Sequence, residues 1–172
     1  MTEDVVANAG PLMALAKLNL LYLLKELYGR VLFTRSVYDE VVLQGIHREF
    51  EDAHVLQRFL RQEGWEPIEV TDVPRLLASA HLDQGEQDSL ALASKLKCLL
   101  LMDEERGRAV AQQFGVPMRG TLGILIQAYR SDLISADQLI FYFGELGRRT
   151  DIWISPALCR RLLAETLGAT AR

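Results

Sequence analysis

The stretch CLLLM at residues 98–102 decides the fold, because it is an unbroken apolar run that stops abruptly at Asp103. A short and wholly apolar run is typical of a strand that is buried on both faces. Strands of this kind belong to parallel sheets that helices cover on either side. We therefore expect residues 98–102 to lie in such a sheet, with Asp103 at the carboxyl end of the strand.

Short apolar runs alternate with helical segments along the rest of the chain. Besides residues 98–102, strands are expected at residues 5–7, 31–33, 65–70 and 116–119. Helices are expected at residues 12–27 with a break near Asn19, 36–44 with Ser36 as N-cap and Gly45 as end, 48–62, 74–80, 85–97, 104–114 with Gly115 as C-cap, 121–130, 136–147 and 156–167. This alternation predicts the α/β class, with a three-layer α/β/α arrangement around a small, mainly parallel sheet, followed by C-terminal helices.

The chain has 172 residues, of which 49% are hydrophobic, and its formal net charge is −4. This length and composition suit one globular domain that needs no disulfide or metal to fold, and they exclude a disordered chain. The negative charge excludes a basic coat that grips nucleic acid over the whole surface. Residues 1–103 carry 10 basic and 16 acidic side chains, whereas residues 104–172 carry 9 basic and 7 acidic ones. A local nucleic-acid site beside the more basic second part stays open.

The first residues, MTED, are acidic where a secretory signal needs positive charge. No apolar run approaches the roughly 18 residues that a membrane span requires. We expect a cytoplasmic protein without a membrane segment. Cys98 and Cys159 lie in apolar surroundings, and we expect two buried thiols rather than a disulfide.

Four polar residues fall just after expected strands or near the starts of helices. Asn8 and Asp103 follow strands, and Glu40 and Glu86 lie early in helices. In parallel sheets, binding sites form at the carboxyl ends of the strands, where these side chains would converge. Clustered carboxylates repel one another unless a cation neutralises them, and Mg²⁺ and Mn²⁺ prefer such oxygen ligands. One or two such ions suit the hydrolysis of phosphodiesters.

Each of these residues also has a purely structural explanation. Glu40 and Glu86 would complement the dipole at a helix start. Asp103 would serve as an N-cap, and Asn8 as a turn residue. Glu104 is more simply explained as a solvated acid of a first helical turn. The spacing alone leaves the functional and the structural explanations open.

The ordered set of motifs resembles the PIN-domain family of nucleases. The matching segments are VVANAGPL at 5–12, SVYDEVV at 36–42, GEQDSLALA at 85–93, LLLMDEE at 99–105 and GTLGIL at 120–125. The resemblance covers roughly residues 5–135. We expect one PIN-like domain over residues 1–172, with a core at about 5–135 and a helical extension at about 136–172.

The resemblance implies a metal-dependent endoribonuclease that uses Mg²⁺ or Mn²⁺, of the type found as the toxin in toxin–antitoxin pairs. Glu40, Glu86 and Asp103 match the second, third and fourth acids of the family, and are expected to be both catalytic residues and metal ligands. Asn8 matches the first acid but is an amide. It offers a carbonyl oxygen to a metal, yet it removes one negative charge from the site.

The resemblance also implies three auxiliary residues and several partners. Thr121 matches a polar position near the site, while Asp88 and Glu104 are substitutes or auxiliaries for the acids. The expected partners are RNA, an antitoxin protein and a second copy of the chain in a homodimer. The arginine pairs at 148–149 and 160–161 are explained as surface charges, as a path for RNA phosphates or as a contact for an acidic partner.

Two alternative functions remain. In the first, the amide at Asn8 marks a weakened site, and the fold serves as an RNA-binding or protein-interaction module. In the second, the same metal site hydrolyses a small phosphorylated substrate.

Overall fold

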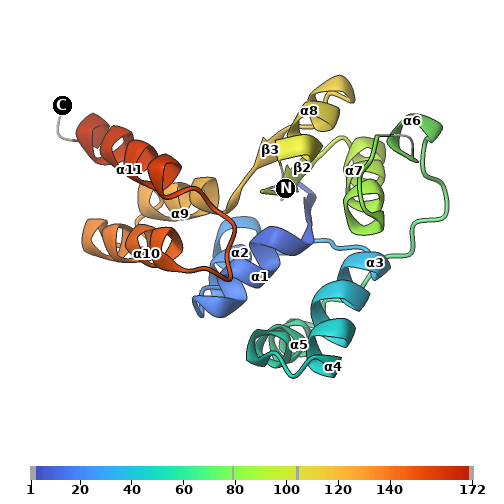
Figure 1. Ribbon diagram of the computed structural model, residues 1–172, viewed down its shortest axis with the longest axis horizontal. Coiled ribbons are helices and arrows are strands. Elements are labelled where there is room, and N and C mark those ends of the chain that lie inside the picture. Colours follow the sequence, from blue (N-terminus) through green and yellow to red (C-terminus); the bar gives the residue numbers. More distant parts are fainter. Residues whose placement is uncertain (1–2, 79, 104, 171–172) are drawn as a thin grey trace. The chain divides into compact units, whose positions relative to one another are not determined.

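The computed structural model describes residues 3–78, 80–103 and 105–170, and the contacts divide the chain into two units. The first unit extends to Thr121 and the second begins at Leu122. Three short parallel strands lie at the centre of the first unit: β1 (Val5–Ala7), β2 (Leu99–Leu101) and β3 (Met118–Arg119), in the order β1-β2-β3 (Figure 1). Their residues pair in parallel register, Val5 with Leu99 and Leu101 with Arg119. The α/β class with a small parallel sheet is therefore confirmed.

The central strands are buried on both faces, as the CLLLM run predicts. Val6 and Leu100 are fully buried in one cluster with Leu90 of helix α7 (Gln84–Leu96). Ala7 and Leu101 alternate with them and are equally buried, so they occupy the opposite face. Helices must therefore cover both faces of this sheet.

The strands expected at 31–33 and 65–70 are reduced to single parallel bridges, which join Val6 to Leu32 and Thr34 to Ile68. The backbone N–H of Ala7 donates to the carbonyl oxygen of Leu32 at 2.8 Å, so this segment does extend the sheet beyond β1. It stays short because Thr34 is already the N-cap of a helix, and its side chain accepts from the N–H of Val37.

The helices of the first unit follow the sequence pattern closely. They are α1 (Ala9–Lys17), α2 (Tyr22–Tyr28), α3 (Arg35–Tyr38), η1 (Asp39–Gln44), α4 (Gly45–His47), α5 (Glu51–Glu63), α6 (Arg75–Ala78), α7 and α8 (Glu105–Gln113). Helix α1 packs against α5 and η1, and α7 packs against β1, β2, α3, α6 and α8 (Figure 1). Asn19 separates α1 from α2 with a positive φ of 57°, and Gly115 follows α8 with φ 65°, as expected.

Two expectations about the second helical segment were wrong. Ser36 is not the N-cap, because Thr34 takes that position and Ser36 lies inside α3. Gly45 does not end the helix, which continues through η1 into α4. Glycine is required there for another reason: a Cβ at Gly45 would lie 2.6 Å from the Cβ of Ala53 in α5. The close approach of two helices, rather than a helix end, explains this glycine.

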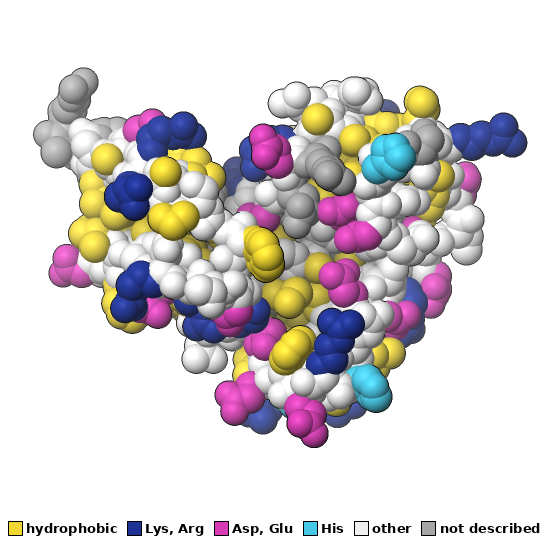
Figure 2. Space-filling view, in the orientation of Figure 1, with side chains coloured by type: hydrophobic (Ala, Val, Ile, Leu, Met, Phe, Trp, Pro, Cys, Tyr) yellow, Lys and Arg dark blue, Asp and Glu magenta, His cyan; other side chains and the backbone are white. Residues whose placement is uncertain are grey.

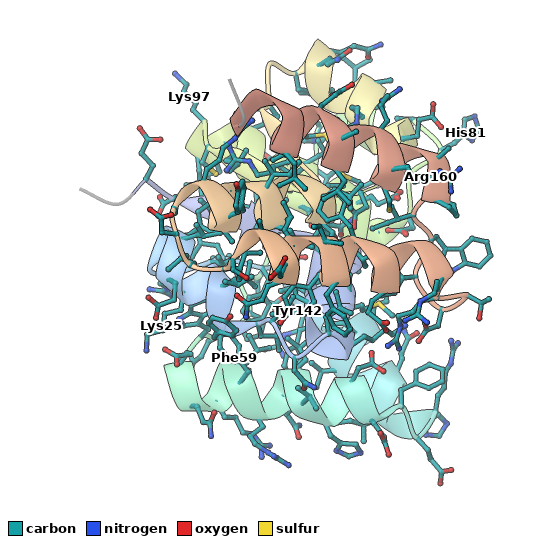
Figure 3. All side chains as sticks on the ribbon, turned by 90° about the vertical axis from the view of Figure 1, so that its left-hand side faces the viewer. Lys25, Phe59, His81, Lys97, Tyr142 and Arg160 are labelled. Atoms are coloured by element: carbon teal, nitrogen blue, oxygen red, sulfur yellow. The ribbon has the colours of Figure 1, made fainter. Side chains whose placement is uncertain are left out.

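The second unit consists of helices. Helix α9 (Thr121–Arg130) enters it, and α10 (Ala136–Arg148) and α11 (Pro156–Thr170) pack against each other. Figure 3 labels Tyr142 on α10 and Arg160 on α11. Leu139, Phe143 and Leu146 form the buried stripe of α10.

Two further expectations can be compared with the structure. Cys98 and Cys159 are buried free thiols, as expected. Among the described residues, no helix combines the length and the apolar character that crossing a membrane demands.

Candidate active site

Asn8 and Asp103 lie at the same edge of the sheet, because each follows the carboxyl end of one of two paired parallel strands. Asn8 comes directly after β1, and its backbone N–H donates to the carbonyl oxygen of Leu101 at 2.8 Å. Its side chain is buried, and the Asn8 Oδ1 accepts a 3.3 Å hydrogen bond from the Ser89 hydroxyl. Asn8 is therefore fixed by α7 and presents an amide at the edge where sites form in such sheets.

The Asp103 carboxylate is held by Thr121, the first residue of α9. The backbone N–H of Thr121 donates to Oδ1 at 2.7 Å, and its hydroxyl donates to Oδ2 at 2.6 Å. Glycines at 10 and 120 leave room for this carboxylate. A Cβ at Gly120 would lie 2.7 Å from Oδ1, and a Cβ at Gly10 would lie 3.2 Å from Oδ2. The carboxylate is therefore positioned from α9 and enclosed by backbone.

Burial raises the pKa of the Asp103 carboxyl above its usual value. The two hydrogen bonds from Thr121 and the charge of Arg108 oppose this rise, but burial has the largest effect. An ionised carboxylate that has lost part of its hydration gains from a nearby cation. The environment of Asp103 therefore favours a bound positive ion.

Glu40 lies on η1, a π-helical turn of a kind often found at functional sites. Its carboxylate approaches the start of α7, where a Cβ at Gly85 would lie 3.2 Å from Glu40 Oε2 and 3.4 Å from Asp83 Oδ1. Two carboxylates thus border the same glycine. Asp83 is not among the site residues expected from the sequence, although its carboxylate lies near that of Glu40. The contact arises between residues more than forty positions apart, so no local signal announces it.

Glu86 stabilises the start of α7, which is the structural explanation that the sequence offered beside that of a metal ligand. Its Oε2 accepts from the backbone N–H of Asp83 at 2.9 Å, and its own N–H donates to Asp83 Oδ1 at 2.8 Å. This reciprocal pair is a capping box at the N-terminus of α7.

Asp88 is buried and links two helices. Its Oδ2 accepts from the Ser36 hydroxyl at 2.6 Å, and its Oδ1 accepts from the Gln84 amide at 2.7 Å. Ser36 belongs to α3, which leads directly into η1 and Glu40. Asp88 therefore fixes the helix that carries Glu40 against α7.

One face of α7 borders both Glu40 on η1 and Asn8 at the edge of the sheet. Gly85 and Ser89 are one helical turn apart, so they lie on the same side of the helix. Gly85 borders the Glu40 carboxylate, and Ser89 donates to Asn8. Figure 2 shows acidic side chains gathered over α3 and α7. Helix α7 thus connects the edge of the sheet, at Asn8, to η1, which carries Glu40.

The donor chemistry of these residues suits a hard divalent cation, since carboxylate and amide oxygens are its preferred ligands. The structure does not gather them into a ready-made cage. Among the described residues, no three Asp, Glu, His or Cys side chains are close enough to hold a metal together. Glu104, the auxiliary acid expected beside Asp103, lies outside the described residues.

In this α/β protein an acid, Asp103, and an amide, Asn8, follow two paired parallel strands, at the edge where binding sites of such sheets form. Comparison with known families specifies the class further. A protein-family model described as a PIN domain matches residues 4–167. The chain therefore belongs to the PIN-domain family. The match continues through residues 136–167, beyond the motifs at 5–125. No curated protein gives a significant match.

PIN domains are generally nucleases, act on nucleic acids and typically use divalent metals. The chain thus has a nuclease-like fold.

Proposed function

We propose that this protein is a metal-dependent endoribonuclease, with one PIN domain that spans residues 1–172. The observation that carries the proposal is the Asp103 carboxylate, which Thr121 orients with two hydrogen bonds at the carboxyl edge of the sheet, where Asn8 follows the neighbouring strand β1. A partly buried and oriented carboxylate is what a metal-assisted reaction requires of its ligands.

Asn8, Glu40, Glu86 and Asp103 are the residues that would hold Mg²⁺ or Mn²⁺. The ion supplies a bound water of lowered pKa and a Lewis acid for the scissile phosphate. The chain's own contributions are positional. Thr121 keeps both oxygens of Asp103 oriented, and Asp88, through Ser36, fixes the helix that carries Glu40.

The test compares RNA cleavage by the wild type and by Asp103→Asn, with and without Mn²⁺. The expected result is cleavage that requires Mn²⁺ and is lost in the variant. Equal cleavage by both proteins would assign the activity to a contaminant and overturn the proposal. A chromogenic phosphate ester is included as a second substrate, because its hydrolysis without RNA cleavage would favour a small-molecule phosphohydrolase.

A weakened, non-catalytic module is the second candidate, and two observations favour it. Asn8 supplies an amide where the family carries its first acid, and Glu86 is engaged in a capping box. Calorimetric titration with Mn²⁺ separates the two candidates. Binding below millimolar concentration favours the nuclease, and its absence at millimolar metal favours the module.

A toxin role extends the nuclease proposal and adds a cytoplasmic location, an antitoxin protein and a homodimer. It is supported by the resemblance of the motifs alone. Expression in a bacterial host tests it: arrest of growth that Asp103→Asn abolishes supports a toxin. Co-purification with the product of an adjacent small gene would then identify the antitoxin.

A further inference from the structure

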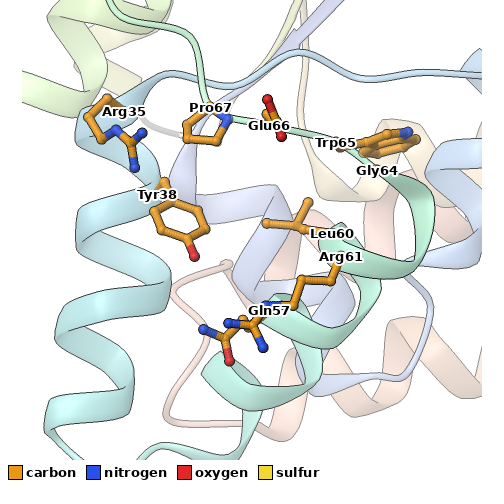
Figure 4. Close-up of a pocket in the computed structure, with 9 residues that line it drawn as sticks. All are labelled: Arg35, Tyr38, Gln57, Leu60, Arg61, Gly64, Trp65, Glu66 and Pro67. Carbon is orange, nitrogen blue, oxygen red and sulfur yellow. The ribbon is translucent and has the colours of Figure 1, made fainter.

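A cavity of about 480 Å³ opens between α3 and α5, on residues that the proposed reaction does not use. Figure 4 shows Arg35 and Tyr38 entering it from α3, and Gln57 and Arg61 from α5. Its volume falls within the range of small-ligand sites. It is lined by Arg35, Tyr38, Gln57, Leu60, Arg61, Gly64, Trp65, Glu66 and Pro67.

The polar groups of the cavity are mainly hydrogen-bond donors. Gln57 and Arg61 are one turn apart on α5, so both face the cavity from the same side. Neither side chain makes a hydrogen bond or an ion pair within the described part of the chain. The Tyr38 hydroxyl lies between the two helices (Figure 4). Two guanidinium groups and an amide at one opening fit an anion, and guanidinium fits a phosphate best.

Two negative charges near the cavity weaken its preference for an anion without removing it. Glu69 accepts from Nε of Arg35 at 3.0 Å, so Arg35 is already paired. Glu66 also lines the cavity, in the segment that follows α5. Arg61 is therefore the cation on which anion binding depends.

The remaining wall is apolar and partly aromatic. Leu60 and Pro67 form it together with Trp65, whose ring points away from Arg35 and Tyr38 (Figure 4). Trp65 is held by an edge contact to Phe59, with ring centroids 5.4 Å apart. A flat ring system packs well against such a wall. The cavity thus offers donors for a phosphate beside a surface for a planar base.

We propose that this cavity is a nucleotide-binding site, in which Arg61 and Gln57 hold the phosphate and the apolar wall receives the base. The nucleotide is either a free mononucleotide or one unit of a single-stranded RNA. The RNA source rests on the proposed nuclease function, whereas binding of the nucleotide itself does not.

The position of the cavity fits an RNA that also reaches the candidate active site. Tyr38 and Glu40 are two residues apart on one continuous helical run, so they face nearly opposite sides of it. A single-stranded RNA that crosses the helical run of α3 and η1 would place one nucleotide in the cavity and another on the side of Glu40.

Tryptophan fluorescence tests the site directly, because Trp65 and Trp153 are the two tryptophans of the chain. Trp153 is 95% exposed, so Trp153→Phe leaves Trp65 as the reporter with little effect on folding. In this background, metal-free protein is titrated with AMP, GMP, CMP and UMP, with free tryptophan to correct for absorption. We expect saturable quenching that Arg61→Ala weakens about tenfold, the loss of one charge-assisted contact.

Arg58→Ala is the matched control, since Arg58 lies on the same helix and does not line the cavity. Absence of saturable quenching, or equal weakening by both arginine variants, would overturn the proposal. Equally tight binding of inorganic phosphate would also overturn it, because the base would then contribute nothing.

A 2′-O-methyl RNA oligonucleotide, added in the same metal-free buffer in which the proposed metal-dependent cleavage cannot occur, distinguishes the two sources. Displacement of a bound mononucleotide by the oligonucleotide identifies an RNA subsite, and lack of displacement identifies a site for free nucleotides. Either result supports the cavity as a nucleotide site. Because this titration needs neither metal nor cleavage, its outcome is independent of the nuclease test.

Discussion

Asp103 and Thr121 are joined by two hydrogen bonds, one from the Thr121 N–H at 2.7 Å and one from its hydroxyl at 2.6 Å. The backbone bond survives substitution of the side chain, whereas the hydroxyl bond does not. A single substitution at Thr121 can therefore change the orientation of Asp103, a proposed metal ligand.

Thr121→Val removes the hydroxyl at nearly constant volume, and we expect it to lower Mn²⁺-dependent RNA cleavage about ten- to a hundredfold, the usual effect of losing a partner behind a metal ligand. The pKa of Asp103 should rise further, because one donor that lowers it is lost. The acidic limb of the pH–rate profile should then move to higher pH. Thr121→Ser is the control and should retain most activity. An unchanged profile in the valine variant would contradict this role.

The raised pKa of Asp103 makes a pH-dependent contribution to stability. Because the pKa in the folded protein lies above the ordinary aspartate value of 3.8, this contribution is fully present below 3.8 and is lost as pH rises through the folded value. Asp103→Asn removes the titration. In metal-free buffer, the free energy of unfolding of the variant minus that of the wild type should increase as pH rises from about 4 through the folded pKa of Asp103. Urea unfolding of both proteins between pH 4 and 8 measures it, and a constant difference would contradict it.

Gly120→Ala should displace the Asp103 carboxylate, since the new Cβ would lie 2.7 Å from Oδ1. We expect destabilisation by about 1–3 kcal/mol and loss of cleavage. Gly144→Ala is the control, because a Cβ there meets nothing within 4 Å and the residue lies inside α10. That variant should gain up to about 1 kcal/mol. Similar unfolding midpoints for the two variants would disprove the crowding.

Ser36→Ala leaves the buried Asp88 without one of its two donors. We expect a loss of about 1–3 kcal/mol of stability, together with weaker cleavage, because α3 carries the helical run to Glu40. Ser131→Ala is the matched control, since Ser131 is exposed and its side chain has no hydrogen bond within the described residues. Thermal unfolding and RNA cleavage are measured in parallel. Equal stability of the two variants would exclude a linking role for Ser36.

Asn8→Asp restores a carboxylate at the edge of the sheet. If Asn8 is a metal ligand, as we propose, Mn²⁺ affinity should rise at least about tenfold, or about 1.4 kcal/mol. The metal-free protein should lose stability, since a buried charge replaces a buried amide. Asn19→Asp is the control, because Asn19 lies in the exposed turn after α1. Equal Mn²⁺ affinities of the two variants, measured by calorimetry, would contradict the role of Asn8 as a metal ligand.

The sequence by itself determined the class of the fold and the residues that end its strands. The CLLLM run specifies a strand buried on both faces, because apolar side chains on both sides of a strand leave no face for water. Asn8 and Asp103 then follow as edge residues, since parallel strands end together. The helices from α5 onward were predicted within a few residues, because periodicity and capping are local signals.

Only the tertiary structure decided how the candidate residues are held. The bonds from Thr121 to Asp103, Ser36 to Asp88 and Ser89 to Asn8 join residues 18, 52 and 81 positions apart. Thr34 rather than Ser36 caps α3, and Gly45 permits contact with Ala53 instead of ending a helix. Local patterns record which conformations a segment prefers. They do not record which distant side chain arrives to satisfy a buried carboxylate, because that depends on the packing of whole elements.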